Sequence, residues 1–321
     1  MSILIYAESA EGKIKKVAFE LASYAKKVAE NIGTTVTAVT INASDVTELA
    51  KYGVNKVLKI NNDTLNGFSA RAYANVIQQA AQKEGAKVIL LSSSTDSLYL
   101  SSLVAVGLEA GFASNVVGLP VSTTPFQVKR TAFSNKAFTI TEITTDVKVL
   151  GLAKNSFGII ENNVALTEEE FNPTSDEADF NVKTTSVEKS SGKVSIADAD
   201  IVVSGGRGLK GPENWGMIEE LAGVLGAATA CSKPVSDLGW RPHGEHVGQT
   251  GKPVATNLYI AIGISGAIQH IAGINSSKVK VVINSDPEAP FFKVADYGVV
   301  GDAFEIVPQL IEKLKAFKSQ H

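Results

Sequence analysis

A glycine-rich loop in the second half of the chain has the residue types that could hold an anion. Residues 204–210, Ser-Gly-Gly-Arg-Gly-Leu-Lys, follow a β-rich run and precede a helical pattern. In that position backbone N–H groups can cradle a phosphate, and Arg207 can add a bidentate charge. The segment matches neither a complete Rossmann motif nor a P-loop. On these residues alone, an anion site and an ordinary tight turn both remain open.

Polar loops recur further along the chain. Residues 247–252, Val-Gly-Gln-Thr-Gly-Lys, let the backbone approach a planar ligand and let Thr250 donate a hydrogen bond. Residues 263–266 follow a strand and open a helix whose N-terminus faces the loops. Residues 284–290 and Asp302 follow two later strands. Because open α/β sheets bind ligands at the carboxyl ends of their strands, we expect these loops to converge at one sheet edge.

Three other chemistries have weaker support in the residues. His243 and His246 flank a Gly-Glu pair, but Pro and Gly break helical register and no third ligand is evident, so a solvated loop is favoured over a metal site. Cys231 ends a short β-rich run and is expected to be a buried small hydrophobe rather than a nucleophile. No nucleophile elbow surrounds Ser265, which argues against a hydrolase. We therefore expect neither a metal site nor a catalytic residue.

The elements that must position the loops alternate between strand and helix. Strands are expected at 201–204, 229–231, 258–262, 279–283 and 297–300, with helical patterns between them and a last helix at 304–317. This rhythm predicts a doubly wound parallel sheet in the C-terminal half, with the polar loops at its carboxyl edge.

The N-terminal half has the same rhythm and a β-rich finish. Strands are expected at 3–6, 36–41, 57–60 and 88–91, with helices at 14–28, 46–52, 70–82 and 98–110. From 121 to 160 the runs 137–143 and 147–151 alternate, which is typical of an antiparallel extension. Residues 92–96 are rich in hydroxyl groups but have no glycine or lysine, so this α/β half is interpreted as a scaffold and partner surface.

A polar connection separates the two halves. Residues 172–193 are poor in large aliphatic side chains and rich in Ser, Thr, Asp and Glu. We expect an N-terminal α/β domain at 1–190, with the connection included, and a C-terminal domain at 191–321. A length of 321 residues and a hydrophobic content of 44% agree with two globular domains.

Charge and composition exclude several partners. The chain has 30 Lys and Arg against 33 Asp and Glu, and few of the basic residues are Arg, so nucleic acid is a poor candidate. The longest near-apolar stretch, 259–268, is about ten residues against the ~20 that a bilayer span needs, so no membrane insertion is expected. One cysteine and no visible signal peptide indicate a reducing compartment. We expect the cytoplasm, or the mitochondrial matrix if the source is eukaryotic.

Several motifs, in order, strongly resemble the α subunit of the electron transfer flavoprotein family. They are Gly-Arg-Gly-Leu-Lys at 206–210, Val-Gly-Gln-Thr-Gly-Lys at 247–252, the run 258–270 and Asp-Pro-Glu-Ala-Pro at 286–290. The resemblance covers residues 195–318 closely and residues 1–160 more loosely. It implies a heterodimer in which the C-terminal domain of this chain holds FAD and a β subunit completes the fold.

The resemblance also implies a function in electron transport. Such a flavoprotein accepts electrons from acyl-CoA-type dehydrogenases, as in fatty acid β-oxidation, and passes them to a quinone oxidoreductase or another part of the respiratory chain. It is a carrier rather than an enzyme with a substrate of its own, because the chemistry belongs to the cofactor. The alternative is the α half of an NADH-dependent electron-bifurcating flavoprotein. Both remain open, because the discriminating residues would lie in the β subunit.

Site residues follow from the resemblance position by position. Arg207 would lie beside the flavin ring, Ser232 and Thr250 would bond its reactive edge, and His270 would lie near its pyrimidine carbonyl. The segment 265–269 would meet the phosphates and the ribityl chain. The complete implied set is Arg207, Ser232, Lys233, Val247, Gly248, Gln249, Thr250, Ser265, Gly266, Ala267, Ile268, Gln269, His270, Asn284, Asp302 and Ala303.

One position departs from the family pattern. The family usually has Ser-Arg where this chain has Ser232-Lys233. Lysine keeps the positive charge but loses the planar fork and the stacking of a guanidinium. We therefore expect Lys233 to alter the redox tuning of the flavin and not its binding.

Overall fold

The computed structural model describes residues 2–133, 135–182, 184–186, 196 and 199–320. The chain divides into two compact units, one of residues 1–133 and 137–188 and the other of residues 134–136 and 189–321. The domain boundary expected between residues 190 and 191 lies outside the described residues. Among the helices that are described, none combines the length and the apolar composition that crossing a membrane requires.

Within the described residues, the N-terminal unit contains one ten-stranded sheet. Its strands are β1 (Ser2–Tyr6), β4 (Thr35–Ile41), β5 (Lys56–Ile60), β6 (Val88–Leu91), β7 (Gly111–Val116), β8 (Ser122–Thr123), β9 (Phe126–Ala132), β10 (Ala137–Glu142), β11 (Lys148–Leu152) and β12 (Thr167–Glu170). The order is β10-β9-β7-β11-β6-β1-β4-β5-β12, and β8 pairs with β9. Neighbours from β7 to β12 are parallel, whereas β8, β9 and β10 form the antiparallel end.

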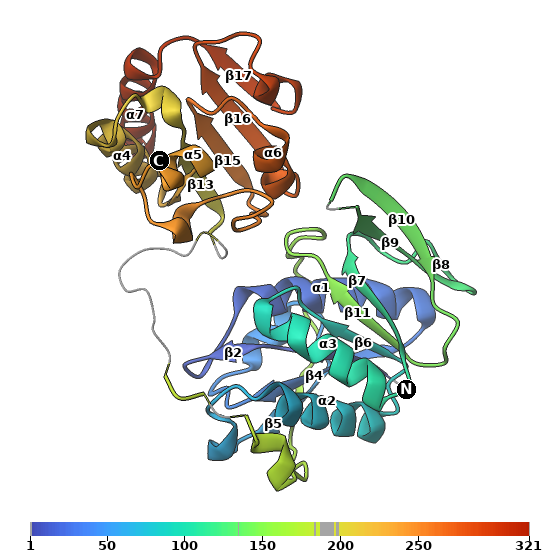
Figure 1. The fold of residues 1–321 in the computed structure, drawn as a ribbon. Helices are drawn as coiled ribbons and strands as arrows, with labels where there is room; N and C mark the ends of the chain where they lie inside the picture. Colours follow the sequence, from blue (N-terminus) through green and yellow to red (C-terminus); the bar gives the residue numbers. More distant parts are fainter. Residues whose placement is uncertain (1, 134, 183, 187–195, 197–198, 321) are drawn as a thin grey trace. The chain divides into compact units, whose positions relative to one another are not determined.

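Helices cover both faces of this sheet (Figure 1). Helix α1 (Lys16–Ile32) packs on the face that receives Ile3 and Ile5, whereas α2 (Ala70–Glu84) and α3 (Thr95–Gly107) pack on the face that receives Leu4. Successive side chains of a strand point to opposite faces, and the apolar run 3–5 of β1 is buried on both sides of the sheet. The connections also contain the strand pair β2 (Ser9–Ala10) and β3 (Lys13–Ile14), and the 3₁₀ helices η1 (Thr47–Lys51), η2 (Asp63–Leu65) and η3 (Glu177–Phe180).

The N-terminal sheet differs from the sequence-based expectation at β7, which was not expected, and at two further strands. The run 147–151 was expected in the antiparallel extension, but β11 lies parallel between β6 and β7. Burial explains the central position of β11, because Val149 packs in the apolar core on one face of the sheet and Leu150 in the core on the other face. Strand β12 was not expected, because its Thr-Glu-Glu-Glu sequence has low β propensity; ion pairs such as Lys59–Glu168 (Nζ–Oε2, 3.1 Å) support it beside β5.

The described part of the C-terminal unit contains a five-stranded parallel sheet. Its strands are β13 (Ile201–Gly205), β14 (Ala228–Cys231), β15 (Leu258–Ile262), β16 (Val279–Asn284) and β17 (Tyr297–Val300), in the order β14-β13-β15-β16-β17. Helices α4 (Gly216–Leu225) and α7 (Ala303–Gln320) lie on one side and α6 (Ile268–Ile274) on the other (Figure 1). The strand order reverses between β13 and β15, so the expected doubly wound sheet is present, with its switch point there.

Short helices fill the loops at the carboxyl edge of the C-terminal sheet. They are η4 (Arg207–Leu209), η5 (Pro212–Trp215), α5 (Lys233–Asp237), η6 (His243–Glu245) and η7 (Pro290–Lys293). Leu209 and Trp215 are buried with residues of α4 in the core on that side of the sheet. These buried side chains therefore anchor the loop after β13 to the core and hold its backbone at the carboxyl edge of the sheet.

Candidate functional site

Two glycine loops touch at the switch point of the C-terminal sheet. The N–H of Gly206 donates to the carbonyl of Ile262 (2.9 Å), and the N–H of Gly208 donates to the carbonyl of Gly263 (3.1 Å). A Cβ atom on Gly206 would lie 2.2 Å from the carbonyl oxygen of Gly263, which no real side chain tolerates. Only glycine permits this approach, which brings the loops after β13 and β15 together. Arg207 is exposed between the two glycines.

The loop after β14 joins the same edge. The N–H of Ser232 donates to the carbonyl of Gly205 (3.1 Å), and its side chain is buried at the start of α5. Lys233 is exposed, and its Nζ lies 3.0 Å from Oδ1 of Asp237 in the next turn. Arg241 bonds both oxygens of Glu245 (2.7 and 2.8 Å). Both cations are thus in ion pairs, but the Lys233 side chain is 56% exposed and that of Arg241 only 16%, so Lys233 is the more accessible of the two.

The loop 247–252 is held between β14 and α6. The N–H of Val247 donates to the carbonyl of Cys231 (3.0 Å), and the N–H of Gln249 donates to the carbonyl of Gln269 (2.8 Å). A Cβ atom on Gly273 would lie 2.6 Å from Cα of Gly248, so the helix and the loop meet at their backbones. The side chain of Val247 is fully buried, whereas Gln249 and Thr250 are exposed.

The segment 265–269 leads into the first turn of α6 and is mostly exposed. The side chains of Ser265, Ala267, Ile268 and Gln269 are exposed. Gly266 has a φ of 87°, and a Cβ there would lie 2.4 Å from the backbone nitrogen of Phe291, so the turn requires glycine. Ala267 is the N-cap residue of α6 and supplies no side-chain cap. The first-turn N–H groups therefore suit an anionic group of a ligand.

Three further predicted residues already have structural contacts. Nδ2 of Asn284 donates to the carbonyl of Ile264 (3.0 Å), which ties the end of β16 to the loop after β15. Oδ1 of Asp302 accepts from the N–H of Phe304 (2.9 Å) at the start of α7. The side chain of Ala303 is buried against the sheet. The structure thus places these residues at the same edge, where their roles toward a ligand remain predictions.

His270 is buried rather than exposed at this edge. The residue is 6% exposed, and its Nε2 lies 2.9 Å from the hydroxyl of Tyr259, a fully buried residue of β15. Burial lowers the pKa of His270 to about 4, with the neighbouring His246 acting in the same direction and the backbone of Val247 opposing both. At neutral pH the imidazole is therefore uncharged and offers one N–H donor.

The burial of His246 and the hydrogen bond of Tyr259 were not predicted from the sequence. His246 was expected in a solvated loop, but it is 2% exposed because its backbone pairs with that of Cys231. Burial lowers the pKa of His246, and the neighbouring His243 adds to the effect. Tyr259 was read as part of an apolar strand, and nothing local to it indicates that His270, eleven residues later, is its partner.

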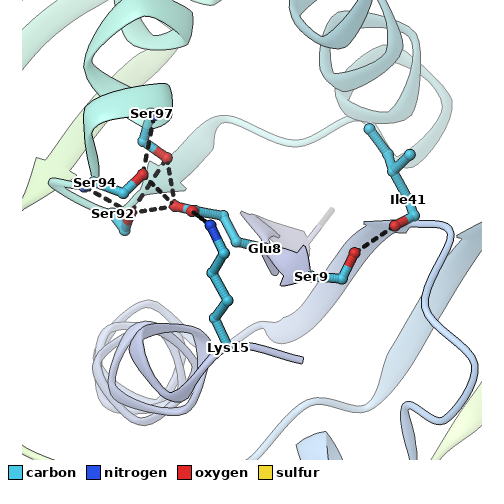
Figure 2. A network of polar contacts seen from close by, with 7 residues as sticks. All are labelled: Glu8, Ser9, Lys15, Ile41, Ser92, Ser94 and Ser97. Carbon is cyan, nitrogen blue, oxygen red and sulfur yellow. Dashed lines mark hydrogen bonds and ion pairs between the residues drawn. The ribbon is translucent and has the colours of Figure 1, made fainter. Parts of the chain in front are cut away.

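A second polar cluster lies at the carboxyl edge of the N-terminal sheet (Figure 2). Glu8 follows β1 and is 2% exposed. Its Oε1 accepts from the hydroxyls of Ser92, Ser94 (2.7 Å) and Ser97 (2.8 Å), and its Oε2 pairs with Nζ of Lys15 (3.1 Å). Although burial raises the pKa of Glu8, these partners together lower it below its usual value. The hydroxyl-rich segment 92–96 therefore holds an anion supplied by the chain itself.

Two family models match the chain. The model described as the electron transfer flavoprotein domain matches residues 3–178, and the one described as the electron transfer flavoprotein FAD-binding domain matches residues 195–275. The electron transfer flavoprotein subunit alpha of Thermoanaerobacterium thermosaccharolyticum is 35% identical, with 98% of each chain covered. That of Syntrophomonas wolfei is 36% identical over 97% of this chain and 98% of its own. That of Bacillus subtilis is 33% identical over 98% of this chain and 97% of its own.

Proposed function

This chain belongs to the electron transfer flavoprotein α-subunit family, and we propose that it carries electrons from acyl-CoA-type dehydrogenases to a quinone oxidoreductase. Its C-terminal unit has the FAD-binding domain of the family, and the family implies a β-subunit partner. The observation that carries the proposal is the meeting of the loops after β13, β14 and β15 at the switch point of the sheet, inside the matched range 195–275.

The residues at this edge fit an FAD. The uncapped start of α6 and the exposed segment 265–269 suit the diphosphate. The glycine contacts of 206 and 208 with 263 bring backbones together without side chains between them. When bound, FAD supplies the one- and two-electron redox chemistry. The chain's own residues would bind and orient it: Arg207 and Lys233 by charge, and Thr250 by its hydroxyl.

The first test concerns assembly. The predicted contact residues Gln249, Thr250 and Ile268 are exposed in this chain, so a partner is needed to cover a bound flavin and exclude water. We expect the chain expressed alone to retain little FAD, and the chain co-expressed with its β subunit to give a yellow 1:1 complex. Gel filtration with absorbance detection at the flavin and protein bands measures both. A stable, fully flavinated monomer would contradict the proposal.

The same preparation distinguishes the two electron-transfer roles. A carrier of the proposed kind holds its redox-active flavin in this subunit. The alternative, the α half of an NADH-dependent bifurcating flavoprotein, needs a second flavin in the partner. Flavin released per heterodimer is therefore measured together with reduction by NADH. Two flavins and rapid reduction by NADH would favour the alternative over the carrier.

A second prediction concerns Lys233. The interaction energy of an exposed charge with a neighbouring charge is ~1 kcal/mol or less. An energy of that size changes the midpoint potential of a two-electron couple by roughly 20 mV. We expect Lys233→Ala to lower the midpoint potential of bound FAD by about that amount, because a positive charge stabilises the reduced, more negative cofactor. Lys233→Arg should retain the potential. Asp237→Asn, which frees Lys233 from its ion pair, should raise it. Potentiometric titration measures all three, and a shift of the opposite sign in Lys233→Ala would contradict the assignment.

A further inference from the structure

The outer side of helix α3 is apolar although it is exposed. α3 lies beside α2 on one face of the N-terminal sheet (Figure 1), and its inner side is buried through residues such as Leu100 and Val104. The opposite side is formed by Leu98, Tyr99, Ser102, Leu103 and Val106, and all five residues are exposed. Because a helix turns by about 100° per residue, these positions form one continuous stripe with Val106 near its centre line. We call these five residues the outer stripe.

The large side chains of the outer stripe leave much apolar surface in water. Their exposed fractions run from 40% for Leu103 to 79% for Val106. Monomeric soluble proteins seldom expose a contiguous apolar patch of more than a few hundred Å², and larger patches mark interaction sites. The neighbouring helix α2 has the ordinary pattern, since its exposed residues are Arg71, Gln82 and Lys83. A helix that is apolar on both sides is normally buried on both sides, so the outer stripe calls for a covering surface.

The charges beside the outer stripe indicate which surface covers it. Asp96 is the only charged residue of α3, the exposed Glu109 follows the helix, and residues 88–128 contain no Lys or Arg. A membrane does not fit, because helices that lie on membranes carry Lys and Arg beside their apolar face. A second copy packed antiparallel would bring Asp96 of each chain near Glu109 of the other, and a parallel copy would bring the two Asp96 together; both place like charges side by side. The covering surface therefore belongs to a different protein, apolar at its centre and neutral or basic beside the two ends of α3.

We propose that the outer stripe is a docking surface for the β subunit. The inference rests on the proposed function, because it takes the β subunit implied by the family to be the permanent partner of this chain. Permanent interfaces are more apolar than transient ones and resemble a protein core cut in half, with tyrosine enriched and charged residues depleted at their centre. The outer stripe has this composition, whereas the exposed residues of α2 do not. Leu98, Tyr99, Leu103 and Val106 are then buried in the heterodimer.

The single cysteine of the chain allows a labelling test of this burial. Cys231 is fully buried, so a thiol introduced at the surface of this chain is the reactive one. Val106→Cys and the control Val121→Cys are prepared as FAD-loaded heterodimers and labelled with a maleimide, and mass spectrometry measures the label on this chain. Val121 lies just before β8 and is 59% exposed, less than Val106, so Val106→Cys would not react more slowly unless a partner covered it.

In the heterodimer we expect Val106→Cys to react about a hundredfold more slowly than Val121→Cys, because the thiol is reached only when the interface opens. Equal rates would overturn the inference. Failure of the wild-type chain to form a complex with the β subunit would instead contradict the proposed function.

The identity of the covering surface is tested by Val106→Glu. A carboxylate buried in an apolar interface is costly, so we expect the affinity between the two subunits to fall about a hundredfold. Val121→Glu is the matched control and should leave the affinity unchanged. Gel filtration of the FAD-loaded heterodimers over a dilution series measures both the affinity and the size of the complex.

Two results of this experiment would overturn the inference. One is an unchanged affinity between the subunits in Val106→Glu. The other is a wild-type heterodimer that pairs into a larger assembly which Val106→Glu separates into single heterodimers, because the stripe would then be covered by a second copy of this chain. If Val106→Glu prevents folding, the labelling rates of Val106→Cys and Val121→Cys decide.

Discussion

Replacing Glu8 with alanine is expected to destabilise the N-terminal unit by about 3 kcal/mol. The substitution removes the acceptor of three serine hydroxyls and the partner of Lys15, and breaking a buried ion pair costs about 3–5 kcal/mol. The lower end applies here, because the Lys15 side chain is 37% exposed and can be rehydrated. Hydrogen exchange of β1 and β6 peptides measures the effect, which should be roughly a hundredfold faster opening.

The effect of Glu8→Ala should depend on pH with a definite sign. The pKa of Glu8 is lower in the folded chain than in the unfolded one, so its contribution is complete above the unfolded value of about 4.3 and is lost as the pH falls through the folded value. The difference between wild type and variant should therefore shrink in acid. Glu48→Ala is the control, since Glu48 is exposed and its loss should cost less than about 0.5 kcal/mol. Equal effects of both substitutions at neutral pH would show that the cluster is not stabilising.

Gly206→Ala is expected to destabilise the C-terminal unit by about 2–3 kcal/mol, within the range for overpacked cores, and to weaken FAD retention with it. The new Cβ would lie 2.2 Å from the carbonyl oxygen of Gly263 and 2.8 Å from Cγ1 of Ile264, so the two switch-point loops must separate. Both tryptophans, Trp215 and Trp240, belong to the C-terminal unit, so their fluorescence during urea unfolding reports on it.

Gly223→Ala is the matched control for Gly206→Ala. Gly223 lies inside α4, and a Cβ there would meet no heavy atom within 4 Å. Alanine is the better helix former by about 0.8–1 kcal/mol, so this variant should be more stable than wild type. A Gly206→Ala protein as stable as the control would show that the loops after β13 and β15 can separate freely.

Local patterns were sufficient for most of the elements. The apolar runs 3–6, 88–91 and 258–262 are strands in the structure, as predicted, because a short apolar run bounded by turn residues has few other ways to be buried. Gly33 ends α1 in the left-handed conformation with a φ of 69°, which glycine adopts more easily than other residues and which is common just after a helix. The family was identified by the resemblance of several motifs in order, and in the motif at 206–210 the structure shows that Gly206 and Gly208 permit a close approach to the backbone of Gly263.

The sequence by itself therefore determined the strand–helix rhythm, the family and the loops at the edge of the C-terminal sheet, all of which depend on residues close together in the chain. Only the tertiary structure decided which strands are neighbours, as with β11 between β6 and β7, and which polar groups meet. Glu8 and Ser92 are 84 residues apart, and Tyr259 and His270 lie on different elements. Periodicity carries no information on such pairs, because whether a carboxylate or an imidazole is buried, and with which partner, depends on how separate elements pack.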